Sequence, residues 1–301
     1  MPLKPVRCGL MSGCKTALPA ACWNGKRSRG TGTIKMPDIL KQIVESRLQD
    51  VRAKTVPLSE LQAQYRNRND FRGFRAALQQ SDASVSLPAV IAEIKRGSPA
   101  RGLFAAGLDA GKAAKQYETG GAVCLSVLTE PYYFYGSMDS LIAARSSSRL
   151  PVLQKDFIVT EYQVYEAALY ADAVLLIARC LETSLLKDLH DLATELRLDV
   201  LVEVFDEDDV KKIEPFHFPL IGINQRNLQT MDVAVGRADG LFSRFDSDQS
   251  VVAASGIKTR SDIEQLMQNG VSAFLIGESL SVSANPVVLL RTLIHGGSGA
   301  D

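Results

Sequence analysis

The sequence predicts an α/β protein, a (β/α)8 TIM barrel with an N-terminal helical extension. After Pro88, short runs of β-branched and apolar residues recur eight times, and amphipathic helical segments separate them. No GxGxxG motif follows the first run, which disfavours the alternative of a doubly wound dinucleotide-binding sheet. The 301 residues, 46% of them hydrophobic, are enough for one such barrel and a terminal extension.

The first 35 residues differ in composition from the rest. They contain seven basic residues and no acidic one, together with the only tryptophan and three of the five cysteines. They show no helical or strand periodicity, so we expect residues 1–35 to be a disordered or targeting extension. Two explanations stay open, an Arg-rich organellar transit peptide or spurious upstream translation ahead of Met36. Residues 36–301 then form the barrel and its covering helices.

Two amphipathic stretches precede the barrel. Apolar residues recur at helical spacing from Asp38 to about Val51, and a second stretch covers Leu58 to Leu78. No linker follows them, so we expect these helices to cover one end of the barrel rather than to form a separate domain.

The eight strand candidates alternate with helices. Helical segments include 111–121, 162–171, 185–197 and 260–270, and several end in glycine or asparagine, which commonly cap a helix C-terminus. The predicted strands are 89–95, 122–128, 151–157, 173–178, 199–204, 220–224, 250–255 and 272–277. Because barrel active sites lie at the C-terminal strand ends, functional side chains are expected there.

Polar side chains do cluster at these predicted strand ends. A barrel interior is apolar and closely packed, so a charged group there needs a partner or a function. Lys155 and Glu203 lie two strands apart and can point into one cavity, which suits general acid and base chemistry. A structural ion-pair network is the alternative. The candidate catalytic and substrate-binding residues are Glu93, Lys95, Lys155, Glu203, Asn224 and Arg226.

The electrostatic surroundings of the lysines are expected to tune their acidity. Burial lowers the pKa of a lysine, whereas a neighbouring carboxylate raises it. With Lys155 near Glu203, and Lys95 near Glu93, we expect proton transfer close to neutral pH.

Two glycine-containing turns follow the seventh and eighth strands, SGIK at residues 255–258 and IGES at residues 276–279. Barrels of this kind bind phosphate at that position through backbone N–H groups and a helix N-terminus. A serine after the first strand supplies a further hydroxyl. The candidate phosphate-binding residues are Ser98, Ser255, Gly256, Gly277 and Ser279.

Other functions find little support in the sequence. His190, His217 and His295 lie away from strand ends, and no HxxxH or CxxC pattern is present, so we expect no metal centre and no serine triad. Since 34 basic residues balance 34 acidic ones, nucleic acid and membranes are not expected partners. We expect a phosphorylated small-molecule substrate and a cytoplasmic protein, or one of the plastid stroma if residues 1–35 are a transit peptide.

The strand ends resemble the indole-3-glycerol-phosphate synthase family of tryptophan biosynthesis across residues 38–295. Six strings carry the resemblance: IAEIKRGSP, EPYYFYGSMDSL, LQKDFIV, LVEVFDEDD, IGINQRNLQT and FLIGESL. It implies a carboxy-lyase without a cofactor that closes the indole ring of 1-(2-carboxyphenylamino)-1-deoxyribulose 5-phosphate with loss of carbon dioxide and water. We expect the protein to be a monomer or a weak homo-oligomer, with contacts to other tryptophan-pathway enzymes.

The same resemblance implies roles for the candidate residues. Lys155 would protonate the substrate ketone as general acid, Glu203 would serve the later dehydration, and Lys95 would grip the substrate carboxylate or share proton transfer. How acid and base work is divided among these three stays open. Glu93 and Asn224 would hold these groups and the sugar hydroxyls, while the guanidinium at position 226 would shape the anthranilate end.

Two positions depart from the family pattern. Ala254 stands where the seventh strand usually ends in glutamate, and the SPSKG turn reads SPARG at residues 98–102. Loss of a negative charge is expected to lower the pKa of the lysines. Two alternatives therefore remain: a catalytically weakened paralogue that binds a phosphorylated ligand, and a related phosphosugar barrel isomerase such as phosphoribosylanthranilate isomerase.

Overall fold

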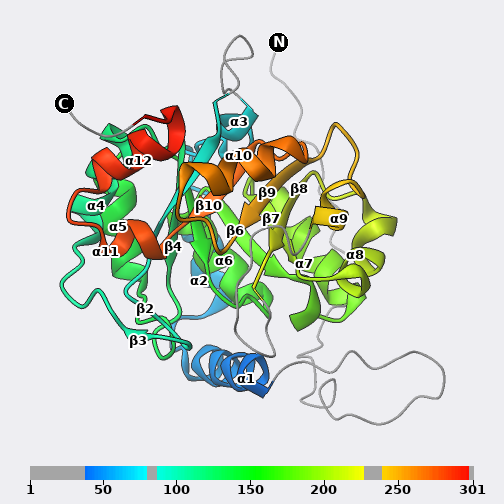
Figure 1. Ribbon diagram of the computed structural model, residues 1–301. Coiled ribbons are helices and arrows are strands. Elements are labelled where there is room, and N and C mark those ends of the chain that lie inside the picture. Colours follow the sequence, from blue (N-terminus) through cyan, green and yellow to red (C-terminus); the bar gives the residue numbers. More distant parts are fainter. Residues whose placement is uncertain (1–37, 80–86, 227–238, 298–301) are drawn as a thin grey trace, which may run out of the picture. The chain divides into compact units, whose positions relative to one another are not determined.

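The computed structural model describes residues 38–79, 87–226 and 239–297. Within these ranges the chain forms a closed barrel of eight parallel strands with helices around it (Figure 1). The predicted fold class is confirmed. The expected extension, residues 1–35, lies outside the described residues. No helix in the described part of the chain is long and apolar enough to span a membrane.

The barrel strands correspond one for one to the eight predicted runs. They are β1 (Ala89–Ile94), β4 (Cys124–Leu128), β5 (Val152–Lys155), β6 (Ala173–Ile177), β7 (Asp199–Val204), β8 (Leu220–Asn224), β9 (Ser250–Ala254) and β10 (Ala273–Ile276). Consecutive barrel strands pair in parallel, and β1 closes the ring against β10 with Ala89 opposite Ala273. The sequence did not predict the short hairpin of β2 (Gly97–Ser98) and β3 (Gly102–Leu103) that follows β1.

The strands are buried on both faces, which explains their sequences. Every residue of β1, β4 and β6 is buried, because side chains on one face fill the barrel and those on the other pack against helices. Such strands appear in sequence as continuous apolar runs rather than as alternating patterns. A polar residue in them is therefore conspicuous.

Helices and short 3-10 turns surround the barrel. Several begin with a side chain that accepts a backbone N–H, such as Asp109, Ser137 and Thr259. The elements are α4 (Ala110–Thr119), α5 (Met138–Ser147), α6 (Glu161–Tyr170), η2 (Ala178–Cys180), α7 (Thr183–Glu195), α8 (Glu207–Ile213), η3 (Glu214–Phe216), α9 (Asp239–Phe242), α10 (Arg260–Gln268), α11 (Glu278–Val282) and α12 (Pro286–His295).

The helices before the barrel differ from the prediction in two ways. The predicted stretch 58–78 is two helices, α2 (Leu58–Tyr65) and α3 (Phe74–Gln79). Arg68, in the connection between these helices, donates to the carbonyl oxygens of Ala168 and Ala171, and this keeps the connection non-helical. They also do not share one end of the barrel. Helix α1 (Asp38–Ala53) lies at the C-terminal strand ends and α3 at the opposite end (Figure 1).

A buried ion-pair cluster joins the α2–α3 segment to the N-terminal end of the barrel. Asp172, 1% exposed, accepts hydrogen bonds from the guanidinium groups of Arg68 and Arg145 at 3.1 Å each. Its oxygens also accept the backbone N–H groups of Arg72 and Val152. This one carboxylate therefore satisfies four donors from three segments of the chain, the α2–α3 connection, α5 and β5.

Candidate active site

A cavity of about 650 Å³ opens at the C-terminal ends of the strands. Its floor is formed by apolar side chains of β4, β6 and β10, and the loops after the strands form its walls. The structure brings all eleven predicted site residues to this one cavity. They are Glu93, Lys95, Ser98, Lys155, Glu203, Asn224, Arg226, Ser255, Gly256, Gly277 and Ser279.

Two lysines and two glutamates form the charged centre of the cavity. Glu93 and Glu203 are 2% and 3% exposed. The Lys95 ammonium lies 2.8 Å from Glu93 Oε1, while the Lys155 ammonium lies 3.8 Å from both Glu93 Oε2 and Glu203 Oε2. Glu93 therefore connects the two lysines. The longer distances around Lys155 leave its ammonium without a close hydrogen bond to either carboxylate.

The electrostatics keep Lys155 protonated. Burial lowers its pKa, but the carboxylates of Glu203 and Glu93 outweigh burial, so the pKa of Lys155 is raised above its usual value. Burial likewise raises the pKa of Glu93, yet the ammonium groups of Lys95 and Lys155 more than offset this and lower it. The expectation that Lys155 is tuned towards neutral pH is wrong, because the two carboxylates favour its ammonium form.

A second group of side chains lies at the ends of β8 and β9. Asn224 Oδ1 accepts the backbone N–H of Arg226 at 3.1 Å, and both side chains line the cavity. In the sheet register Asn224 lies opposite Ala254, whose methyl group also lines the cavity. Position 254 therefore faces the site, as the sequence predicted, and contributes no charge there.

The phosphate candidates form a polar corner of the cavity. The hydroxyls of Ser98 and Ser279 are buried and have no hydrogen-bond partner among the described residues. Ser255 and Gly256 have consecutive positive φ angles of 71° and 86°, an unusual turn that for serine is strained. Buried donors without partners are costly, which indicates that this corner is shaped for an acceptor such as a phosphate oxygen.

Gly277 allows the polar corner to touch the charged centre. A Cβ atom at this position would lie 2.3 Å from Glu93 Oε1, so only glycine lets the start of α11 approach that carboxylate. The Ser281 hydroxyl lies between the same elements, accepting the backbone N–H of Lys95 at 3.3 Å and donating to the Glu93 carbonyl at 3.4 Å. The polar corner and the acid–base group are thus fixed relative to each other.

The sequence did not identify the outer walls of the cavity. Helix α1 contributes Ile39, Leu40 and Ile43, and aromatic rings from three strand-end loops complete the apolar wall. The aromatic residues are Phe134, Phe157 and Phe205. Charged residues of the cavity lining include Lys258 and an ion pair between Arg101 Nη1 and Glu278 Oε1, which lie 2.6 Å apart. Helical periodicity revealed that α1 has an apolar face, but it does not reveal which end of the barrel that face covers.

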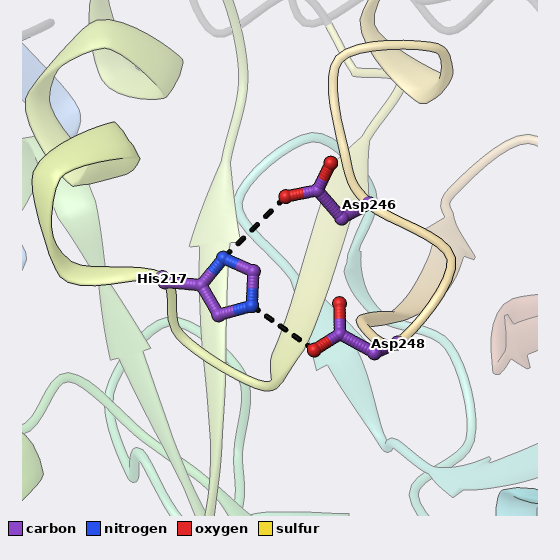
Figure 2. Close-up of side chains that lie close together, drawn as sticks. All are labelled: His217, Asp246 and Asp248. Atoms are coloured by element: carbon purple, nitrogen blue, oxygen red, sulfur yellow. Dashed lines mark hydrogen bonds and ion pairs between the residues drawn. The ribbon is translucent and has the colours of Figure 1, made fainter.

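One histidine lies among carboxylates, away from the cavity. His217 Nε2 lies 3.1 Å from Asp248 Oδ2, and Nδ1 lies 3.5 Å from Asp246 Oδ2 (Figure 2). All three residues are exposed and precede β8 or β9, so they lie at the N-terminal end of the barrel. The carboxylates approach different ring nitrogens. We therefore interpret the group as a surface ion-pair cluster rather than a metal centre.

Solved structures with the same architecture include two proteins crystallised with small phosphate esters. KGPDC from Streptococcus mutans, in complex with D-R5P, superposes with a TM-score of 0.55 at 11% identity and covers 68% of this chain and 95% of its own. (S)-3-O-geranylgeranylglyceryl phosphate synthase from Thermoplasma acidophilum, in complex with sn-glycerol-1-phosphate, has a TM-score of 0.50 at 14% identity and covers 81% and 98%. At these identities the likeness shows the fold alone.

Sequence comparisons are more specific. The family model described as indole-3-glycerol phosphate synthase matches residues 40–293. Indole-3-glycerol phosphate synthase of Desulfosudis oleivorans is 46% identical over 262 residues, which cover 86% of this chain and 99% of the relative. The Leptothrix cholodnii enzyme of the same name is 41% identical over 261 residues, with the same coverage. With its strand-end lysines and glutamates around one cavity, the chain belongs to the indole-3-glycerol phosphate synthase family.

Proposed function

We propose that the chain acts as a carboxy-lyase that closes the indole ring of 1-(2-carboxyphenylamino)-1-deoxyribulose 5-phosphate, releasing carbon dioxide and water. The observation that carries the proposal is the position of the Lys155 ammonium, 3.8 Å from each of two buried carboxylates at the base of the cavity. A protonated lysine with no close hydrogen bond to either carboxylate can donate its proton to a substrate oxygen placed near it.

Ring closure uses Lys155 as general acid. The aromatic carbon that bears the carboxylate attacks the ketone carbon, and the carbonyl electron pair moves to the oxygen, which takes the Lys155 proton. The bond to the carboxylate then breaks, its electrons restore the aromatic ring, and carbon dioxide leaves. Lys95, whose ammonium lies 2.8 Å from Glu93 Oε1, pairs with the substrate carboxylate before this step.

Dehydration completes the indole. Glu203 accepts a proton from the new five-membered ring while the hydroxyl leaves as water with a proton from Lys95. The two lysines thus supply two protons and the glutamate takes back one, which balances the single proton consumed when a carboxylate substrate loses carbon dioxide and water. Glu93, between the two ammonium groups, keeps both oriented during these transfers.

Substrate binding uses the other cavity residues. The phosphate accepts hydrogen bonds from the hydroxyls of Ser98 and Ser279 and from the backbone around Gly256 and Gly277, with Ser255 at the same turn. These hydroxyls supply donors that have no partner among the described residues. Glu93 and Asn224 contact the sugar hydroxyls, and Arg226 shapes the anthranilate end, where the apolar wall accepts the ring.

The test is to incubate the purified chain with the synthetic carboxyl-labelled substrate and to follow indole fluorescence together with released carbon dioxide. We expect both products in equal amounts. Lys155→Met should lower turnover about 10²- to 10⁴-fold, the range a general acid contributes. Lys187→Met, on the exposed face of α7, is the matched control and should keep full turnover.

The alternatives give different results in the same assay. A phosphate-binding paralogue would bind the substrate without forming either product. An isomerase would release no carbon dioxide and form no indole from the labelled substrate, and it would convert phosphoribosylanthranilate supplied in its place. Either outcome would overturn the proposal.

A further inference from the structure

The residue that follows Lys155 is held by an arginine from the N-terminal helix. Asp156 is 2% exposed, and Arg47 grips its carboxylate with two hydrogen bonds, Nε to Oδ1 and Nη2 to Oδ2, both 2.9 Å long. Thr129 Oγ1 donates to Oδ2 at 2.5 Å, and the backbone N–H of Phe157 donates to Oδ1 at 2.8 Å. These four hydrogen bonds fix the Asp156 carboxylate, and so they restrain the backbone directly after Lys155.

The network continues from Arg47 to the loop after β4. Arg47 Nη1 donates to Asp50 Oδ2 at 2.6 Å, and Asp50 Oδ1 accepts the hydroxyl of Tyr132 at 2.8 Å. The contacts thus join α1, the loop after β4 and the end of β5. Both partners of the central pair are buried, so the pair is not a screened surface contact.

Arg47 also lies on the face of α1 that forms the cavity wall. Ile43, Leu40 and Ile39, which line the cavity, precede it by four, seven and eight residues. At 3.6 residues per turn these positions share one side of a helix. An arginine that fixes this face to the end of β5 therefore sets two parts of the site at once.

We propose that Arg47 is a positioning residue for the ring-closing reaction: by gripping Asp156 it fixes the strand end that carries Lys155 and holds the apolar face of α1 over the substrate. The inference rests on the proposed function, because it takes Lys155 to be the general acid. A lysine side chain is long and flexible, and a misplacement of about 1 Å at a reacting group costs about 100-fold in rate. A bidentate guanidinium restrains Asp156 more tightly than an ammonium does.

The first variant is Arg47→Lys, which keeps the charge and loses the bidentate geometry. We expect kcat to fall about 10- to 100-fold while KM changes less than about threefold, because the phosphate corner is elsewhere. The charged groups that face Lys155 are Glu203, Glu93 and Arg226. Since the two carboxylates raise the pKa of Lys155, drift of its ammonium away from them should move the alkaline limb of the pH–rate profile to lower pH.

A second variant distinguishes a loss of positioning from a folding defect. Arg47→Met combined with Asp156→Asn removes both charges and leaves no buried ion without a partner. We expect it to unfold at a higher temperature than Arg47→Met alone and still to show the reduced kcat. Arg68→Lys is the control, since Arg68 is equally buried and pairs with a buried aspartate at the opposite end of the barrel. It should unfold at a lower temperature with kcat and pH profile unchanged.

The outcomes separate the two proposals. If Arg47→Lys loses thermal stability like the control but keeps wild-type kcat and pH profile, Arg47 is only structural and this inference is wrong. Full kcat in the double variant would refute it equally. Lys155→Met, assayed in parallel, reports on the proposed function alone: unchanged turnover there refutes the assignment of the general acid, whichever result Arg47 gives.

Discussion

Replacing Asp172 with asparagine measures how far the buried ion-pair cluster stabilises the barrel. The change is nearly isosteric, so it removes a charge and one acceptor oxygen without opening a large cavity. Asp172 accepts from two guanidinium groups at 3.1 Å and from two backbone N–H groups at 3.1 and 3.0 Å. Its asparagine replacement cannot satisfy all four donors with one oxygen.

The size of the effect follows from burial. Removing one partner of a buried ion pair costs about 3–5 kcal/mol, because the remaining charge stays desolvated. A domain of this size loses about 2–4 °C in its unfolding midpoint for each kcal/mol, so the midpoint should fall by about 6–20 °C. The cavity is at the opposite end of the barrel, and kcat should be unchanged.

Asp70→Asn is the matched control, because Asp70 pairs with the same two arginines, Arg68 and Arg145, but its side chain is 56% exposed. Solvent screening limits the expected loss to about 1 kcal/mol or less.

Partial burial raises the pKa of Asp70, but hydrogen bonds from Arg145 and Arg68 lower it from 3.8 to about 2. Its contribution should therefore be present above about pH 4, decline below that pH, and be lost as the pH falls through about 2. Equal losses for Asp70→Asn and Asp172→Asn in thermal and urea unfolding would refute the argument from burial.

Three further predictions concern the cavity and the N-terminus. Gly277→Ala places a Cβ atom 2.3 Å from Glu93 Oε1, so we expect Glu93 to move away from Lys95 and kcat to fall about 10- to 100-fold; unchanged turnover would show that Glu93 has no part in the reaction. Ala254→Glu adds a carboxylate to the cavity and should move the alkaline limb of the pH–rate profile upward, whereas superimposable profiles would place position 254 outside the chemistry. Removal of residues 1–35 should leave turnover and thermal stability intact, because the family match begins at residue 40; an insoluble truncated chain would contradict this.

The strands could be predicted because most of their residues are buried, so each run is mainly apolar and its polar residues are few. Their ends were less well predicted, for local reasons. The third predicted run extends to residue 157, but β5 ends at Lys155, because Asp156 accepts the N–H of the residue after it. The break between α2 and α3 depends on Arg68 reaching carbonyl groups 100 and 103 residues away, which no local pattern reveals.

The cavity residues could be predicted because parallel strands of a barrel end on the same side, so polar residues at those ends converge. What the pattern does not contain is how they are linked. Glu93 contacts both lysines, which depends on side-chain reach across the barrel. The hydrogen bonds between Arg47 and Asp156 join residues 109 positions apart. In the sequence, nothing distinguishes Arg47 from the other charged residues of an amphipathic helix.

The alanine at position 254 bears on whether the chain retains its catalytic chemistry. A general acid must be protonated before it acts, and the carboxylates that keep Lys155 in its ammonium form come from β1 and β7, not from β9. The missing glutamate therefore does not remove the acid. The substrate proposed for this cavity carries a carboxylate and a phosphate. A neutral side chain at position 254 does not repel these anionic groups, whereas a glutamate would. Both arguments favour an active enzyme with altered pH dependence over a weakened paralogue.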